Sequence, residues 1–201
     1  LSIRRQRQMC IRDSVNSNDI LLTDYLDKTA IKRLNNGGKV LLSLKKGTLK
    51  DEYGGNLAIG FCSICWSTSW TNGQAPHTLG ILCNPKHPAL AAFPTEYHSN
   101  YQWWDAMTHS APIRINKVSK EAQPIVRVID DWFSNHPLAL LFEVKIGKGK
   151  LVVSGIDFHR DMQMRPAARQ LLSSLLNYMQ SSDFSPRHIV KIETINDLID
   201  K

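Results

Sequence analysis

The most regular pattern of hydrophobic and polar positions lies between residues 164 and 180. Its apolar side chains recur three or four positions apart, which is the spacing of a helix with one buried face. Pro166 stands near its start, where a first-turn proline is tolerated. The pattern predicts a long amphipathic helix. Its expected buried face is Met164, Ala168, Leu171, Leu172, Leu175, Leu176 and Met179.

Short, nearly continuous apolar runs predict buried strands elsewhere in the chain. Residues 138–146 and 151–156 flank Gly-Lys-Gly-Lys at 147–150, and two apolar runs around such a turn indicate a β-hairpin. Four further runs read as strands: 39–44, 78–82, 113–115 and 125–132.

The region before residue 44 combines a helix pattern with a strand pattern. Thr23 or Asp24 is expected to cap a helix that ends near Leu34, and Asn-Asn-Gly-Gly at 35–38 then stops it. A helix, a Gly-Gly stop and an apolar strand are typical of an α/β domain. We therefore predict an α/β fold, a sheet with flanking helices that ends in a β-hairpin and a long helix.

Composition supports one globular domain. The chain has 201 residues, of which 42% are hydrophobic and 21% charged. No apolar run approaches the roughly 18 residues of a membrane helix, so no membrane partner is expected. Four cysteines are too few for a disulfide scaffold.

The basic N-terminus changes the charge balance. Residues 4–14 resemble the translation of a transposase adapter used to prepare sequencing libraries, so we expect residues 1–14 to be an artefact and the remainder to be a piece of a longer protein. The segment holds four Arg and one Asp, and without it the formal charge falls from +7 to +4. This excess no longer favours a nucleic-acid partner. The segment also lacks the apolar core of a signal peptide.

Asp157 and His159 form the best acid–base cluster because they directly follow a predicted strand. Ligand sites in α/β folds lie at the carboxyl ends of strands, so a free-standing hydrolase using this pair is one hypothesis. The alternative, which we favour, is a polar loop that caps the long helix. The sequence contains neither a Gly-x-Ser-x-Gly elbow nor a phosphate-binding glycine loop.

Cys62 and Cys65 have metal-ligand spacing, and Cys83 with His77 could complete a set of four. The surrounding residues look strand-like, which would point the two thiols to opposite faces. Ordinary buried cysteines are the better interpretation, and we expect no metal and no cofactor.

The densest aromatic segment lies between residues 96 and 104. Tyr and Trp faces stack on sugar rings, and polar neighbours bind the hydroxyls, so the segment is a weak candidate for carbohydrate binding. The alternative is a helix that packs through its Trp residues against the sheet or another domain. The candidate sugar contacts are Glu96, Tyr97, Tyr101, Trp103 and Trp104.

Several motifs together resemble the C-terminal region of family 2 glycoside hydrolases, the β-galactosidase-like enzymes of gut Bacteroidetes. The most specific is Phe-Pro-Thr-Glu-Tyr-His-Ser-Asn-Tyr-Gln-Trp-Trp-Asp at 93–105, and residues 76–90, 125–132, 141–143 and 147–151 add to it. The resemblance covers residues 19–185. It implies a three-layer, flavodoxin-like domain similar to class I glutamine amidotransferases, usually without their catalytic Cys and His. In that family the catalytic carboxylates lie on an upstream (β/α)₈ barrel, so no catalytic residue is transferred to this chain.

The resemblance therefore implies that residues 15–185 are a non-catalytic accessory domain and that residues 186–201 are a C-terminal tail. The parent enzyme would act on β-linked glycans in the periplasm or outside the cell. The expected partners are the upstream domains of the parent, with a glycan or a second copy left open. The carbohydrate-binding module and the free-standing hydrolase remain the alternatives.

Overall fold

The computed structural model describes residues 19–61 and 77–199. The predictions for residues 1–14 and for Cys62 and Cys65 lie outside the described residues.

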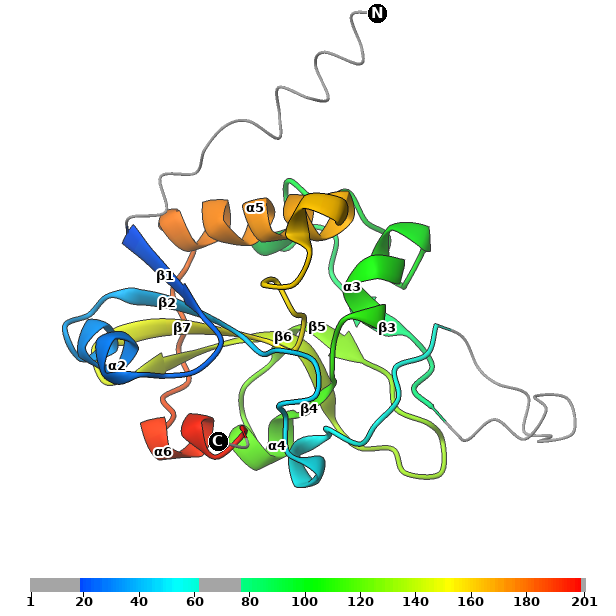
Figure 1. The fold of residues 1–201 in the computed structure, drawn as a ribbon, viewed down its shortest axis with the longest axis horizontal. Coiled ribbons are helices and arrows are strands. Elements are labelled where there is room, and N and C mark those ends of the chain that lie inside the picture. Colours follow the sequence, from blue (N-terminus) through cyan, green and yellow to red (C-terminus); the bar gives the residue numbers. More distant parts are fainter. Residues whose placement is uncertain (1–18, 62–76, 200–201) are drawn as a thin grey trace, which may run out of the picture.

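Seven strands in the described residues form one mixed sheet (Figure 1). The strands are β1 Ile20–Thr23, β2 Lys39–Ser43, β3 Ile81–Cys83, β4 Ile113–Arg114, β5 Pro124–Val128, β6 Leu138–Ile146 and β7 Gly149–Ser154. Their order is β1-β2-β7-β6-β5-β3, and β4 also pairs with β6. β1, β2 and β7 are parallel, whereas the pairs of β6 with β7, β5 and β4 and of β3 with β5 are antiparallel. The predicted α/β class is confirmed, with a mixed sheet.

Helices lie on both faces of this sheet. The α-helices are α2 Lys28–Asn35, α3 Trp104–Thr108, α4 Ile115–Val118, α5 Pro166–Gln180 and α6 Ile192–Asn196. Short 3₁₀ turns are η2 Asp51–Tyr53, η3 Pro88–Leu90, η4 Tyr101–Trp103 and η5 Met162–Met164. One hydrophobic cluster joins the sheet to α3 and α5, and a second joins it to α2, α4 and α6 (Figure 1).

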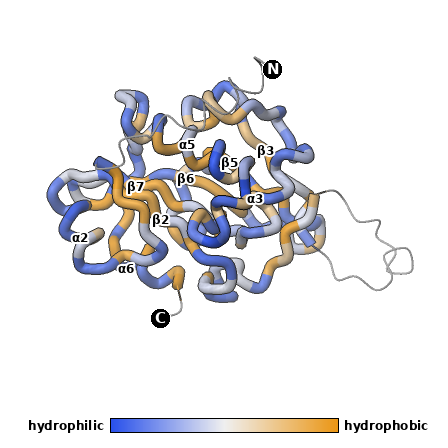
Figure 2. The backbone as a smooth tube through the Cα atoms, turned by 45° about the horizontal axis from the view of Figure 1, so that its top comes forward, coloured by the Kyte–Doolittle hydropathy of each residue, from blue (hydrophilic) through white to orange (hydrophobic). Residues whose placement is uncertain are grey.

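The central strands contain continuous apolar runs because both faces of the sheet are covered. In β2, Leu41 belongs to the cluster under α5, while its neighbours Val40 and Leu42 belong to the cluster under α2. In β7, Val152 and Val153 divide in the same way. Figure 2 shows the resulting hydrophobic path along β2, β6 and β7.

The predicted hairpin is confirmed as β6 and β7, which pair from Leu141 with Ser154 to Ile146 with Gly149. Gly147 closes the turn with φ of 56°, a left-handed conformation that favours glycine. Gly37, with φ of 84°, similarly follows the end of α2. Because these glycines mark local turns, the sequence alone predicts both the hairpin and the end of α2.

The long helix is confirmed, but its predicted start is wrong. α5 begins at Pro166, and Met164 lies in the preceding 3₁₀ turn with 77% of its surface exposed. Proline disfavours helical backbone at the residue before it, and Arg165 has φ of −115° and ψ of 75°. Leu175 is fully buried, whereas Leu172 is only partly buried against the same core.

The expected cap of α2 is also wrong. Asp27 caps this helix, since its Oδ1 accepts a hydrogen bond of 2.7 Å from the Ala30 amide. Thr23 instead ends β1, and its hydroxyl donates to the Tyr25 carbonyl. Asp24 forms an ion pair with Lys45. The cap therefore lies three or four residues later than predicted, because β1 occupies residues 20–23.

The C-terminal segment packs on the body of the domain. The Lys145 amide donates to the His188 carbonyl, and the Val190 amide donates to the Lys145 carbonyl. Ile195 and Leu198 are fully buried in the cluster that contains α2. In the described ranges, no helix is both long and apolar enough to cross a membrane.

Candidate functional site

The carboxyl ends of β1, β2 and β7 meet at one edge of the sheet because these strands are parallel neighbours. This edge is where α/β folds commonly bind ligands. The loop after β7 brings Asp157 and His159 there, as the sequence predicts for the end of a strand. Their contacts decide between an acid–base site and a structural loop.

Asp157 is used to hold its own loop. Its Oδ1 accepts backbone hydrogen bonds of 2.8 Å from His159 and 3.1 Å from Arg160. Burial raises the pKa of Asp157, but these bonds and a backbone bond from Lys46 bring it below its usual value. A carboxylate that stays ionised and occupied in this way is a poor proton donor.

His159 and Ser43 are also committed to backbone partners. The His159 Nε2 donates to the Ser43 carbonyl oxygen over 3.2 Å. The Ser43 hydroxyl donates to the Ile156 carbonyl at 2.9 Å and accepts from the Phe158 amide at 2.9 Å. The hydroxyl beside the predicted acid–base pair is therefore a connection between β2 and the loop after β7.

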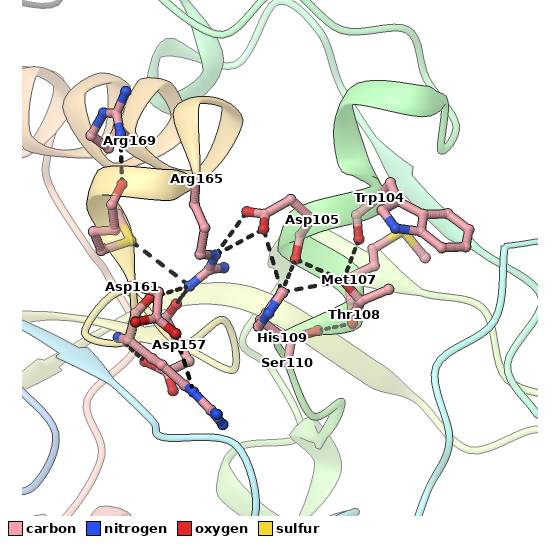
Figure 3. Close-up of polar contacts among 12 residues, drawn as sticks. Trp104, Asp105, Met107, Thr108, His109, Ser110, Asp157, Asp161, Arg165 and Arg169 are labelled. Carbon is pink, nitrogen blue, oxygen red and sulfur yellow. Dashed lines mark hydrogen bonds and ion pairs between the residues drawn. The ribbon is translucent and has the colours of Figure 1, made fainter.

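A buried arginine, Arg165, contacts both this loop and α3. The Arg165 Nε lies 2.8 and 3.0 Å from the two carboxylate oxygens of Asp105 in α3. Its Nη1 donates to the carbonyls of Asp157 at 2.6 Å and Arg160 at 3.1 Å. Figure 3 shows the guanidinium between Asp105 and the loop that carries Asp157. Arg165 thus connects the start of α5 to α3 and to the loop after β7.

His109 extends the same network. Its Nδ1 lies 2.9 Å from the Asp105 carbonyl and 3.4 Å from the Asp105 Oδ1 (Figure 3). The carboxylate of Asp105 therefore lies between one guanidinium and one imidazole. This arrangement neutralises the buried charge of Arg165, which is 4% exposed.

The aromatic candidates separate in the structure. Trp103 is buried, and its Nε1 donates to the Thr95 hydroxyl at 2.7 Å. Its neighbour Trp104 is 56% exposed and stacks on Phe61 with ring centroids 4.7 Å apart. Tyr101 is almost fully exposed. The buried Trp103 therefore cannot share a sugar platform with the exposed Tyr101 and Trp104.

Tyr97 lines a groove of about 410 Å³ beside β3 and β5, and the other aromatic candidates do not line it. Asn84, Gln123 and Arg127 line the same groove. Planar polar side chains and one aromatic ring are the groups that bind sugar hydroxyls and ring faces. Glu96, which is exposed, does not line the groove but accepts a hydrogen bond from the Cys83 thiol through its carbonyl.

Glu143 forms a separate half-buried pair with α5. The Tyr178 hydroxyl donates to Glu143 Oε2 at 2.6 Å. Burial raises the pKa of Glu143, although Tyr178 and the charges of Lys150 and His188 oppose this shift. Burial and the bond to Glu143 together raise the pKa of Tyr178. The Glu143 carboxyl group therefore stabilises the protonated phenol of Tyr178, and their hydrogen bond connects β6 with α5.

A larger cavity at the carboxyl edge was not anticipated from the sequence. It has a volume of about 720 Å³ and lies beside the ends of β1 and β2. Asp24, Tyr25 and Lys45 line it, together with Asn196 from α6. The signal that could have found it is the position of Asp24 and Lys45 just after two neighbouring parallel strands.

Metal binding finds no support in the described segments. They contain no group of three or more His, Cys, Asp or Glu side chains that could hold an ion. Cys83 is buried, and burial raises the pKa of its thiol. The Nδ1 of His77 lies 2.7 Å from the carbonyl oxygen of Thr78.

One known protein family matches nearly the whole of the described chain. A family model described as Domain of unknown function (DUF8487) matches residues 21–200. The chain belongs to this family. The DUF8487 match includes the hairpin, α5 and the C-terminal segment with α6. No curated protein matches the chain.

Proposed function

We propose that this DUF8487 domain is a non-catalytic accessory domain of a larger glycoside hydrolase of the family 2 type, which acts on β-linked glycans. One observation carries the non-catalytic part of the proposal. The Asp157 carboxylate accepts two backbone hydrogen bonds, so the best acid–base candidate in the chain serves to shape a loop. The connection to glycosidases rests on the motif at residues 93–105 and the other segments that resemble that family.

The partner we propose is the upstream part of the same parent chain. Tyr101, Trp104, Trp132 and Phe133 each expose more than half of their surface. A contiguous patch of exposed apolar side chains would mark an interaction surface, and we assign these four side chains to the contact with the upstream part. A second copy of the chain is the other occupant to test. By its resemblance, the parent belongs in the periplasm or outside the cell.

We also propose that the domain is a variant of the flavodoxin-like, three-layer architecture. The parallel block of β1, β2 and β7 and the helix α2 that connects β1 to β2 support this relation. The antiparallel strands β5 and β3 would then replace the far part of the parallel sheet.

The alternative function is glycan binding in the groove beside Tyr97. One observation favours it, because Tyr97 shares that groove with Asn84, Gln123 and Arg127. This version of the hypothesis keeps Tyr97 from the aromatic segment and assigns no sugar contact to Trp103, which is buried.

The test is to incubate the purified 201-residue chain with nitrophenyl β-galactoside, β-glucuronide and α-rhamnoside. A double variant, Glu96→Gln with Asp157→Asn, serves as the matched control. We expect release equal to background for both proteins, because a retaining glycosidase needs two carboxylates about 5–5.5 Å apart on either side of the bond. Release that is lost in the double variant would refute the proposal and favour a free-standing hydrolase.

A further inference from the structure

The cavity at the ends of β1 and β2 has the position and size of a small-molecule site. Its volume is about 720 Å³, within the roughly 300–1,000 Å³ typical of ligand pockets. Thr23 and Leu42 pair in the parallel register just before the strands end, so the following residues emerge side by side. Asp24 follows one strand and Lys45 the other, and both line the cavity.

The charges around the cavity balance. Asp24 and Asp27 contribute two carboxylates, and Lys28 and Lys45 contribute two ammonium groups. Burial raises the pKa of Asp24, but the hydrogen bond from Lys45 and the nearby positive charges hold it below its usual value. Asp24 and Lys45 therefore remain a charged pair at neutral pH, and the cavity carries no net charge to attract a simple anion or cation.

The remaining lining is aromatic and apolar. Tyr25 is 57% exposed, and Ile31 and Ile199 line the same cavity. A phenol ring and aliphatic side chains favour contact with a C–H surface, while the Asn196 amide offers both a donor and an acceptor. The ligand must therefore combine an apolar face with neutral polar groups.

We propose that this cavity binds a neutral saccharide, with the face of one sugar ring on Tyr25 and two neighbouring hydroxyls on the Asp24–Lys45 pair. A hydroxyl is both a donor and an acceptor, so one can donate to the Asp24 carboxylate while the next accepts from the Lys45 ammonium. Hydrogen bonds to charged groups are stronger than neutral ones, and neither charge has to be left unpaired. The proposal assigns this cavity a ligand that the accessory-domain proposal does not require.

The experiment is an NMR titration of the ¹⁵N-labelled full chain with lactose, cellobiose and xylobiose. Glucuronic acid and glucosamine serve as charged comparators. We expect at least one neutral disaccharide to bind with a dissociation constant of about 1 mM or lower. The amide shifts should centre on Tyr25, Lys45 and Asn196. No shift at these positions up to about 20 mM of every disaccharide would overturn the proposal.

Variants test whether Tyr25 and Asp24 contact the sugar. Tyr25→Ala should weaken binding about tenfold, because stacking on the ring is lost. Tyr101→Ala removes another exposed tyrosine and should leave the affinity within about twofold. Asp24→Asn leaves Lys45 without its carboxylate, so it should weaken the neutral sugar and strengthen glucuronic acid.

Three results would overturn the assignment: shifts centred on Tyr97 instead of Tyr25, equal losses in Tyr25→Ala and Tyr101→Ala, or tighter binding of a charged comparator to the unmodified chain. Each is independent of glycosidase turnover, so failure here and failure of the accessory-domain proposal are distinguishable.

Discussion

Replacing Arg165 with methionine should destabilise the domain more than any surface change near the candidate site. Methionine keeps part of the apolar stem but removes the guanidinium that Asp105 and the carbonyls of Asp157 and Arg160 contact. Breaking a buried ion pair costs about 3–5 kcal/mol. The Asp105 side chain is 23% exposed, so water can recover part of its solvation. We therefore expect the free energy of unfolding to fall by about 3 kcal/mol.

Urea unfolding of the full chain measures this loss, and Arg160→Met is the matched control. The Arg160 side chain is 75% exposed and forms a surface ion pair with Asp161. Such pairs contribute little, so the control should change the free energy of unfolding by less than about 0.5 kcal/mol. In thermal unfolding, Arg165→Met should lower the midpoint by about 6–12 °C for a domain of this size.

A double-mutant cycle with Asp105→Asn isolates the pair itself. Residues that share a buried network show coupling energies of about 0.5–3 kcal/mol, and we expect a value in the upper half of that range. A loss below about 1 kcal/mol for Arg165→Met would refute the reasoning that the network is structural. So would equal effects of Arg165→Met and Arg160→Met.

Two further predictions concern α5. Leu175 is fully buried, so Leu175→Ala should lower the free energy of unfolding by about 2–5 kcal/mol, and Leu172→Ala should cost less because Leu172 is partly buried; the reverse order would contradict the packing. The pKa of Glu143 is higher in the folded protein than in the unfolded chain. Its protonated form therefore stabilises the fold at pH values below the unfolded-state pKa, and this stabilisation is lost as the pH rises through the folded-state pKa. Glu143→Gln keeps an acceptor for Tyr178, so its stability relative to the unmodified chain should increase between about pH 4 and 7. A difference that is constant with pH would contradict this.

The elements with local signals could be predicted from the sequence. The β6–β7 hairpin has a glycine with positive φ between two apolar runs, and α5 has a helical spacing of apolar residues that the sheet then buries. The start of α5 could not be found from spacing alone, because the exposed Met164 happens to continue the periodicity. The effect of Pro166 on the preceding backbone decided that boundary.

The candidate site was only partly predictable. The position of Asp157 after a strand is a local property, and it placed the residue at the correct edge of the sheet. The network that surrounds its loop depends on Arg165 and Asp105, which are 60 residues apart in the sequence and share no local pattern. Trp103 and Trp104 also show that local sequence does not determine exposure. They are neighbours in the chain, yet Trp103 is buried and Trp104 is exposed.

The most direct test of the central claim is the genomic sequence upstream of the codon for Val15. The accessory-domain account predicts that the reading frame continues upstream into a (β/α)₈ barrel that carries two glutamate or aspartate residues at strand ends. An initiator codon shortly upstream of Val15, with no barrel before it, would contradict the account. The DUF8487 domain would then have to perform its function alone.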